Sequence, residues 1–151
     1  MSYPRNAVNE AFKLLTVKDT RISRIIHAAI GYQETKYLTR AQYGGGPARS
    51  YWQFERQTVK AVMLHAASAR LAIAVCEARN VEFNSQKIWE AMETDDVLGA
   101  AFARLLMWTD SQPLPTTEAA AWEMYAERVW RPGKPHPEDW PTSWAFGLAN
   151  V

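Results

Sequence analysis

The sequence has little of several features that mark particular classes of protein. Its 151 residues include one cysteine, Cys76, which excludes a disulfide within the chain. Seventeen lysines and arginines nearly balance 16 aspartates and glutamates, and the formal net charge is +1. Because nucleic-acid binding needs a concentrated basic excess, we expect no nucleic-acid partner. No apolar run approaches the ~18 residues that span a bilayer, so we also expect no membrane insertion.

Local metal-ligand patterns are missing too. His27, His65 and His136 lie far apart in the sequence, and none has a second ligand at the spacing of a zinc site. Cys76 lies on the apolar stripe of a predicted helix, which favours a small buried side chain over a nucleophile. The glycine-rich run 44–47 lacks the Lys-Ser/Thr of a phosphate-binding loop. We therefore predict no metal and no cofactor.

The first twenty residues do not resemble a signal peptide. Lys13, Lys18 and Asp19 interrupt their apolar pattern, and no apolar core of the required length is present. We therefore expect that the protein is made in a cytosol and does not reach an envelope by the ordinary secretory route.

The residues that are abundant favour a single, mainly α-helical domain. Alanine, the strongest helix former, occurs 23 times, whereas glycine occurs 7 times. A length of 151 residues suits one domain. Apolar residues recur at spacings of three and four, which predicts helices over about 5–16, 20–37, 57–79, 85–89, 95–108 and 117–129. No strand pattern of convincing length is present, although a short extended piece within 50–55 stays open.

The C-terminal part of the chain has a different composition. Residues 130–151 hold four of the eight prolines and three of the seven tryptophans. We predict a helical domain over residues 1–129, followed by an extended Trp/Pro-rich tail with one last helical turn. The tail has two interpretations. It packs on the domain and completes the core, or its aromatic residues anchor the chain to a partner.

Glu34 is the most informative acidic residue. It follows Ile26 and Ile30 at helical spacing, so it lies on the apolar face near the end of its predicted helix. Apolar surroundings and the negative end of the helix dipole both disfavour the charged carboxylate. The raised pKa that results is what a general acid needs near neutral pH. The alternative, which position alone favours, is a solvated glutamate paired with Lys36 or Arg40.

A group of aromatic and amide side chains follows the glycine-rich loop. Tyr51, Trp52 and Gln53 stand where this loop leads into the next predicted helix. Aromatic faces stack on sugar rings, and an amide binds sugar hydroxyl or N-acetyl groups. The alternative is that Tyr51 and Trp52, together with Phe54, belong to the core.

The order of these residues resembles the soluble lytic transglycosylases and goose-type lysozymes. That family has Glu-Ser/Thr, a loop, and then Gly-Ala-x-Gly-aromatic/Leu-x-Gln-hydrophobic-x-Pro-x-Thr. This chain has Glu34-Thr35, then Pro47-Ala48-Arg49-Ser50-Tyr51-Trp52-Gln53-Phe54, then Thr58. A short phage-encoded branch is more similar still, and the resemblance covers about residues 20–134. The matching segments are Gln33-Glu34-Thr35, Gly45-Gly46-Pro47-Ala48, Trp52-Gln53-Phe54-Glu55 and Arg104…Gln112-Pro113-Leu114-Pro115…Ala121-Trp122.

The resemblance implies a lysozyme-like helical fold and a catalytic acid. Glu34 would protonate the bond between N-acetylmuramic acid and N-acetylglucosamine in peptidoglycan. Gln53, with Tyr51 and Trp52, would hold the glycan strand. Tyr125 would stand in for the family's late tyrosine near the acid. Trp130 begins the nearest run to the family's Tyr-Asn-x-Gly segment and joins the expected substrate-binding residues.

Two departures from the family pattern keep a second hypothesis open. Ser50 replaces the family's second glycine, and Arg56 replaces its proline. Glu55 is a nearby second carboxylate, which we do not assign as a nucleophile. The first hypothesis is a phage virion component that degrades peptidoglycan at the host cell wall. The alternative is a non-catalytic structural virion protein on a lysozyme-like scaffold, whose tail contacts other virion proteins.

The two hypotheses predict different sites. An enzyme should have Glu34 in the wall of an open cleft with Gln53 nearby. A cleft plugged by the chain's own tail, or Glu34 locked against an arginine, would favour the structural protein.

Overall fold

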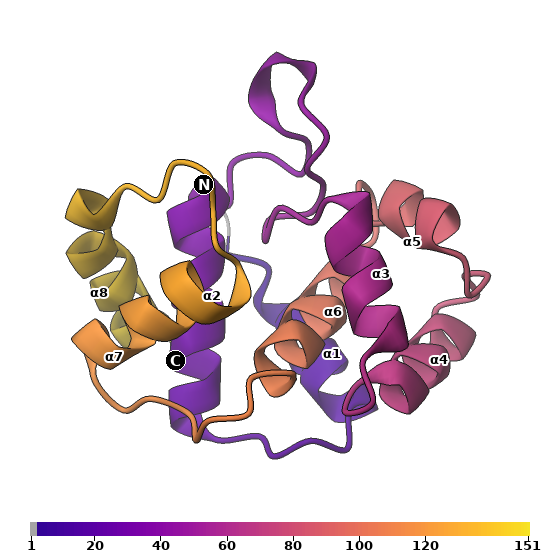
Figure 1. Cartoon of the computed structure of the whole chain (residues 1–151), viewed down its shortest axis with the longest axis horizontal. Coiled ribbons are helices and arrows are strands. Elements are labelled where there is room, and N and C mark those ends of the chain that lie inside the picture. The colour runs from indigo at the N-terminus through magenta and orange to yellow at the C-terminus, as the bar shows by residue number, and fades with distance from the viewer. Residues whose placement is uncertain (1–2) are drawn as a thin grey trace.

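A computed structural model describes residues 3–151, which fold into helices joined by loops (Figure 1). The predicted mainly-α class is confirmed. Within the described residues there is no strand, and only two isolated bridges pair Arg49 with Ala41 and with Phe54. The helices are α1 (Arg5–Leu14), α2 (Arg21–Thr35), α3 (Arg56–Leu64), α4 (Ala69–Ala78), α5 (Ser85–Ala91), α6 (Asp96–Trp108), α7 (Glu118–Trp122) and α8 (Trp140–Asn150), with 3-10 turns η1 (Tyr43–Gly45) and η3 (Pro137–Asp139) and the π-helical segment η2 (Glu123–Val129).

The centre of the molecule is α6. Every residue from Val97 to Met107 is buried, so this helix is covered on all sides. Figure 1 shows α3, α4 and α5 on one side of it and α2, α7 and α8 on the other. Its predicted start is confirmed, because the Asp95 carboxylate accepts the Leu98 amide at 3.1 Å and caps the helix. The same carboxylate pairs with Arg79 at 3.0 Å.

The single helix predicted over 57–79 is wrong, because α3 ends at Leu64 and α4 begins at Ala69 after a bend of 113°. Two side chains satisfy backbone groups that the break leaves unpaired. The Ser68 hydroxyl donates to the carbonyl of Val62 at 2.6 Å, and the His65 ring accepts the Ala67 amide at 3.0 Å. The bend lets both α3 and α4 pack against α6.

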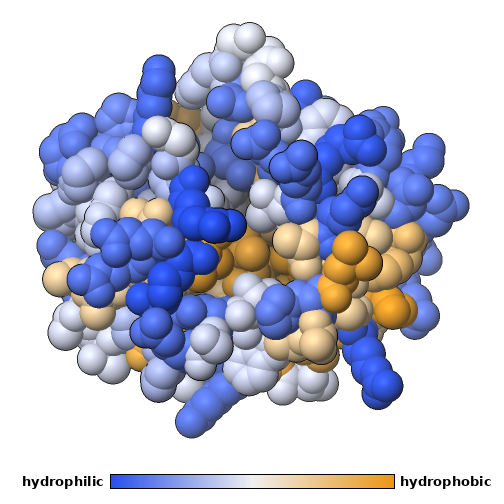
Figure 2. All heavy atoms as spheres, viewed as in Figure 1, coloured by the Kyte–Doolittle hydropathy of each residue, from blue (hydrophilic) through white to orange (hydrophobic). Residues whose placement is uncertain are grey.

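Apolar residues are visible on the outside of this part of the molecule. Figure 2 shows orange atoms over α3 and α4, and these helices carry the exposed residues Leu64 and Ile73. Within residues 3–151, no single helix has both the length and the apolar composition of a membrane span, and only the bent pair α3 and α4 reaches them together.

The C-terminal segment is more ordered than its composition predicts. Residues 140–150 form α8, so the predicted extended tail with one helical turn is wrong there. This helix packs along α2 more extensively than any other pair of elements packs together. A Cβ built on Gly147 would lie 2.6 Å from the carbonyl oxygen of Ile25, which shows how closely the two backbones approach. Trp140 and Trp144 are buried in the chain itself.

Candidate active site

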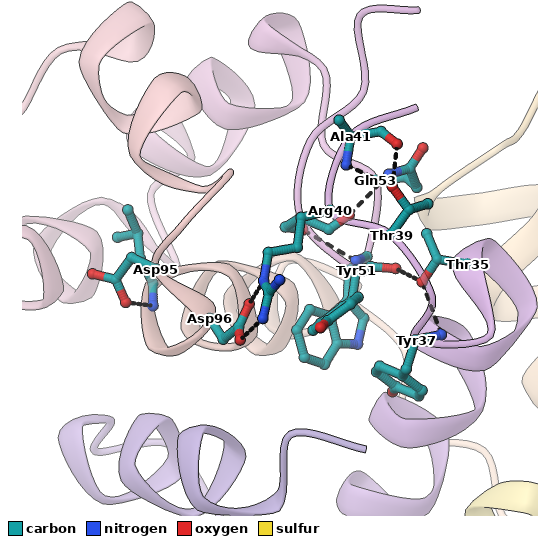
Figure 3. Close-up of polar contacts among 12 residues, drawn as sticks. Thr35, Tyr37, Thr39, Arg40, Ala41, Tyr51, Gln53, Asp95 and Asp96 are labelled. Carbon is teal, nitrogen blue, oxygen red and sulfur yellow. Dashed lines mark hydrogen bonds and ion pairs between the residues drawn. The ribbon is translucent and has the colours of Figure 1, made fainter. Parts of the chain in front are cut away.

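The end of α2 is tied to the turn that carries Gln53. The Thr35 hydroxyl donates to the carbonyl oxygen of Tyr51 at 2.9 Å and accepts the amide of Tyr37 at 3.2 Å (Figure 3). Because Thr35 directly follows Glu34, these bonds hold the last turn of α2 against residues 50–53. In the Glu34-Thr35 pair, the side chain of Thr35 therefore fixes the position of the carboxyl group of Glu34.

The turn itself uses two residues in the left-handed region. Ser50 has φ 70° and Gln53 has φ 55°. Glycine adopts this conformation without strain, whereas serine and glutamine side chains adopt it less readily. Here the Ser50 hydroxyl accepts the Trp52 amide at 3.0 Å, and the Gln53 side-chain amide donates to the Ser50 carbonyl at 2.9 Å. The departure at Ser50 is thus compensated within the turn.

Glu34 and Gln53 line one open cavity of about 500 Å³. It lies between the start of α3, the loop before it and the segment that follows η2. The complete lining is Glu34, Gln42, Ala48, Gln53, Glu55, Thr58, Trp130, Arg131, Pro132, Gly133 and Lys134. The structure therefore brings together Glu34, Gln53 and Trp130 from three distant parts of the sequence. No residue of α8 lines this cavity, so the C-terminal helix does not plug it.

Two further cavities adjoin the Glu34 cavity. A neighbouring cavity of about 380 Å³ shares Thr58, Trp130 and Arg131 with it, and another of about 430 Å³ shares Glu55. The three cavities adjoin one another beside α3, and Glu34 lines the one of about 500 Å³. We call the three together the α3 groove.

Tyr125 contacts the acid directly. Its hydroxyl donates to Oε2 of Glu34, and its ring stacks on Trp140 with centroids 5.4 Å apart and planes at 4°. The backbone of η2 is widened here, because the amides of Trp130 and Arg131 both bond to the Tyr125 carbonyl, at 2.9 and 3.2 Å. Such π-helical turns are frequent at functional sites. The sequence predicted Tyr125 near the acid, and the structure places it there.

Burial raises the pKa of Glu34 to about 7, and the hydrogen bond from Tyr125 opposes this rise. The pairing partners considered from the sequence do not hold it. Arg40 forms two bonds to Asp96, at 2.7 and 2.9 Å (Figure 3), and Lys36 is exposed. Within residues 3–151, Glu34 takes part in no ion pair. A substantial fraction of the carboxyl groups is therefore protonated near neutral pH.

The prediction that Tyr51 and Trp52 contact substrate is wrong. Trp52 has an exposed fraction of 0% and donates its ring N–H to the carbonyl of His27 at 2.9 Å. Tyr51 is 7% exposed, and the guanidinium of Arg40 covers its ring at 4.7 Å from the centroid. Neither ring has a free face for a sugar, so both belong to the core. The turn at Ser50 directs them inward, while Gln53 reaches the cavity.

Trp130 is held at the cavity by its own hydrogen bond. Its ring N–H donates to the carbonyl of Trp52 at 3.0 Å, and its ring packs near Phe54 and Tyr125. It is partly exposed, unlike Trp52. Trp130 is therefore the aromatic side chain in the lining of the Glu34 cavity, and Trp89 lines the neighbouring cavity of about 430 Å³.

Sequence reasoning missed what holds the opposite wall of the cavity. The side-chain amide of Gln33 donates to the carbonyls of Pro135 and His136, at 3.1 and 3.0 Å, and accepts the Ser143 hydroxyl at 2.7 Å. Gln33 thus ties the wall segment to α2 and α8. The sequence analysis also did not identify Lys134, a positively charged residue in the lining of the Glu34 cavity. The only sequence signal for Gln33 was its place beside Glu34 in the family motif.

The histidines and the cysteine, whose side chains could in principle bind a metal or act as nucleophiles, lie outside the Glu34 cavity. His27 is fully buried and Nε2 lies 2.9 Å from the Ala100 carbonyl, and burial lowers its pKa to about 3. Burial also raises the pKa of the Cys76 thiol to about 11, which disfavours the reactive thiolate. Among the described residues, one group has three donors close enough for an ion, His136, Glu138 and Asp139, all of them exposed. None of these three lines the Glu34 cavity.

Comparisons of the chain with protein-family models, curated proteins and solved structures find no match. Function is therefore inferred from the site. A carboxyl with a pKa of about 7 and a tyrosine partner, in the wall of an open cavity, is equipped to donate a proton to a bound ligand. The amide of Gln53, the indole of Trp130 and the ammonium of Lys134 are equipped to hold polar groups and rings beside it.

Proposed function

We propose that this protein cleaves the glycosidic bond between N-acetylmuramic acid and N-acetylglucosamine in peptidoglycan, with Glu34 as the acid. The observation that carries the proposal is the state of Glu34, which combines a pKa of about 7, no ion pair and a place in the wall of an open cavity. The family resemblance of residues 33–58 supplies the choice of substrate. The α3 groove supports it, since an extended polymer needs space on both sides of the cleaved bond.

Glu34 carries both proton transfers in this proposal. Its proton passes to the glycosidic oxygen as the bond from that oxygen to the anomeric carbon breaks, and the Glu34 carboxylate remains. The Tyr125 hydroxyl donates to this carboxylate and stabilises it. The carboxylate then takes a proton from the group that attacks the anomeric carbon. That group is the muramyl 6-hydroxyl in a lytic transglycosylase, which leaves an anhydro sugar, or water in a lysozyme.

The number of carboxylates favours the transglycosylase reaction. Most glycosidases use two acidic residues, one of which activates water or attacks the sugar. Intramolecular attack by the muramyl hydroxyl needs one. In the Glu34 cavity the second acid is Glu55, which is exposed at the N-terminal end of α3. We assign Glu34 alone to the reaction and expect anhydro ends on the products.

The first test is release of soluble muropeptides from purified peptidoglycan, with products identified by mass spectrometry. Glu34→Gln keeps the size of the side chain but cannot donate the acid proton. We expect it to lower the rate by about 10²–10⁴-fold, the usual contribution of a general acid. Glu77→Gln is the matched control, because Glu77 is exposed on α4 and lies outside the groove. A folded wild-type protein that releases nothing would overturn the proposal in favour of a non-catalytic scaffold.

The resemblance also leads us to propose that the protein is a phage virion component that is made in the host cytoplasm and acts at the host wall. Immunodetection in purified phage particles tests this. Contacts with other virion proteins would use residues other than Trp140 and Trp144, which are 3% and 8% exposed. On α8, the large apolar side chain that is exposed is that of Leu148.

A further inference from the structure

A second cavity, of about 490 Å³, lies at the other end of α2 from Glu34. It is formed by residues 18–22, the end of α6 and the loop 110–114. Thr20 caps α2 and lines this cavity, and Glu34 follows 14 positions later, about 20 Å along the helix. The two cavities share no lining residue. Most of the lining is apolar, from Ile22, Met107, Trp108, Pro113 and Leu114.

Arg104 lines this cavity, and its guanidinium carbon lies 5.8 Å from the centroid of the Trp108 ring, but no carboxylate within residues 3–151 forms an ion pair with it. The residue is 1% exposed. One nitrogen, Nη2, donates to the carbonyl of Lys18 at 2.9 Å. Nε and Nη1 are buried and have no hydrogen-bond partner within residues 3–151. Buried guanidinium groups are normally paired or fully hydrogen-bonded, because an unpaired charge in an apolar environment is costly.

The acidic groups around Arg104 are already occupied. Asp19 binds Arg24 through two bonds, at 2.7 and 3.0 Å. Asp110 lines the cavity but binds Arg128, at 3.2 and 3.0 Å. Burial lowers the pKa of Arg104 to about 10, so the guanidinium stays charged at neutral pH.

We propose that this cavity binds a small organic carboxylate with an apolar body. The carboxylate supplies the counter-charge that Arg104 lacks, and the two charges attract each other more strongly in apolar surroundings than in water. Lys18 adds a second positive charge to the lining. The apolar body packs against Trp108, Pro113 and Leu114. This inference does not depend on the Glu34 site, since the two cavities are separate.

The test compares ligands that differ only in charge, using the full chain. We would titrate 4-phenylbutyrate and 4-phenylbutanol and follow binding by calorimetry and by backbone amide shifts. The acid should bind about tenfold or more tightly than the alcohol, because the alcohol lacks the negative charge that Arg104 attracts. Shifts should be largest in residues 18–22 and 104–114. Equal binding of the two probes, no binding of either, or shifts confined to other residues would overturn the proposal.

A variant separates Arg104 from the rest of the cavity. Arg104→Met keeps much of the side-chain volume and removes the charge, so it should abolish the preference for the acid. Arg70→Met is the matched control, because Arg70 is exposed on α4 and lines no part of this cavity. If Arg104→Met retains the preference, Arg104 is not the anion site. The comparison of the two probes on the wild-type chain stands even if this variant fails to fold.

A second pair of probes distinguishes two sources of such a carboxylate. N-acetyl-Ala-Ala-Phe with a free C-terminus and the same peptide with an amidated C-terminus carry the same apolar groups. A preference for the free peptide would identify peptide C-termini as ligands, and a preference for phenylbutyrate over phenylbutanol alone would identify free acids. The absence of both preferences would overturn the proposal.

Discussion

At the scale of single residues, the surroundings of Glu34 make it an acid. Burial favours its neutral form and raises its pKa to about 7, while Tyr125 donates to it and favours the ionised form. A group balanced in this way gives up a proton and takes it back near neutral pH. The same balance has a consequence for stability, because Glu34 in the unfolded chain ionises near its ordinary pKa of about 4.5.

Between about pH 4.5 and 7, the unfolded chain releases the Glu34 proton and the folded protein keeps it. The unfolded state then binds fewer protons, so the free energy of unfolding falls as the pH rises through this window and levels off above it. The stability difference between wild type and Glu34→Gln should change by about 3 kcal/mol from pH 4 to pH 8, in favour of the variant at high pH. Urea unfolding of both proteins across this range measures it. A constant difference would contradict the raised pKa.

At the scale of the elements, Gln33 joins three parts of the chain. Its side-chain amide binds the carbonyls of Pro135 and His136 and accepts the hydroxyl of Ser143 on α8. The neighbouring residues 130–134 form one wall of the Glu34 cavity. Gln33 is therefore a positioning residue. Gln33 does not itself line the cavity. It acts by holding residues 130–134 at a fixed distance from Glu34.

Gln33→Ala removes these bonds and should loosen the wall. We expect amide hydrogen exchange in residues 131–137 to become about tenfold faster, as for the loss of a net hydrogen-bond contribution of about 1 kcal/mol or more. Exchange within α6 should stay unchanged. On a soluble peptidoglycan fragment, KM should rise more than kcat falls. Gln86→Ala on α5 is the matched control, and equal exchange in the two variants would show that Gln33 does not hold the wall.

At the scale of the whole molecule, the first and second halves of the chain complete the site together. Glu34 comes from α2, and its partner Tyr125 is 91 residues later. Trp140, at the start of α8, stacks on the Tyr125 ring, and α8 packs on α2. The packing of α8 against α2 therefore stabilises the fold and also supports the contact between Tyr125 and Glu34.

The substitution Gly147→Ala tests the close packing of α8 against α2. The added methyl group would lie 2.6 Å from the Ile25 carbonyl oxygen, so α8 must shift away from α2. Overpacking of this kind costs about 2 kcal/mol, which thermal or urea unfolding would detect. Gly133→Ala is the control, because no atom lies within 4 Å of a Cβ built there. Equal stability of the two variants would contradict the close contact of α2 and α8.

The helical class and the starts of α2 and α6 could be predicted from the sequence, as could the place of Glu34 near the end of its helix. These depend on interactions over a few residues. Thr20 caps α2 by accepting the Ser23 amide at 3.2 Å, and Asp95 caps α6 in the same way. Periodicity likewise placed Glu34 on the apolar face, because it needs only the spacing of neighbours along one helix.

The tertiary structure alone decided the break between α3 and α4, the helical form of α8 and which side chains reach the cavity. Each depends on surfaces that meet across the chain. Local spacing does not show that Trp52 would be covered by the core, or that Gln33 would bind a segment about 100 residues away. The same reason applies to Arg104, whose missing counter-ion follows from two aspartates that fold onto other arginines. Burial and long-range pairing are properties of the packed molecule, whereas helix formation is largely a property of the local sequence.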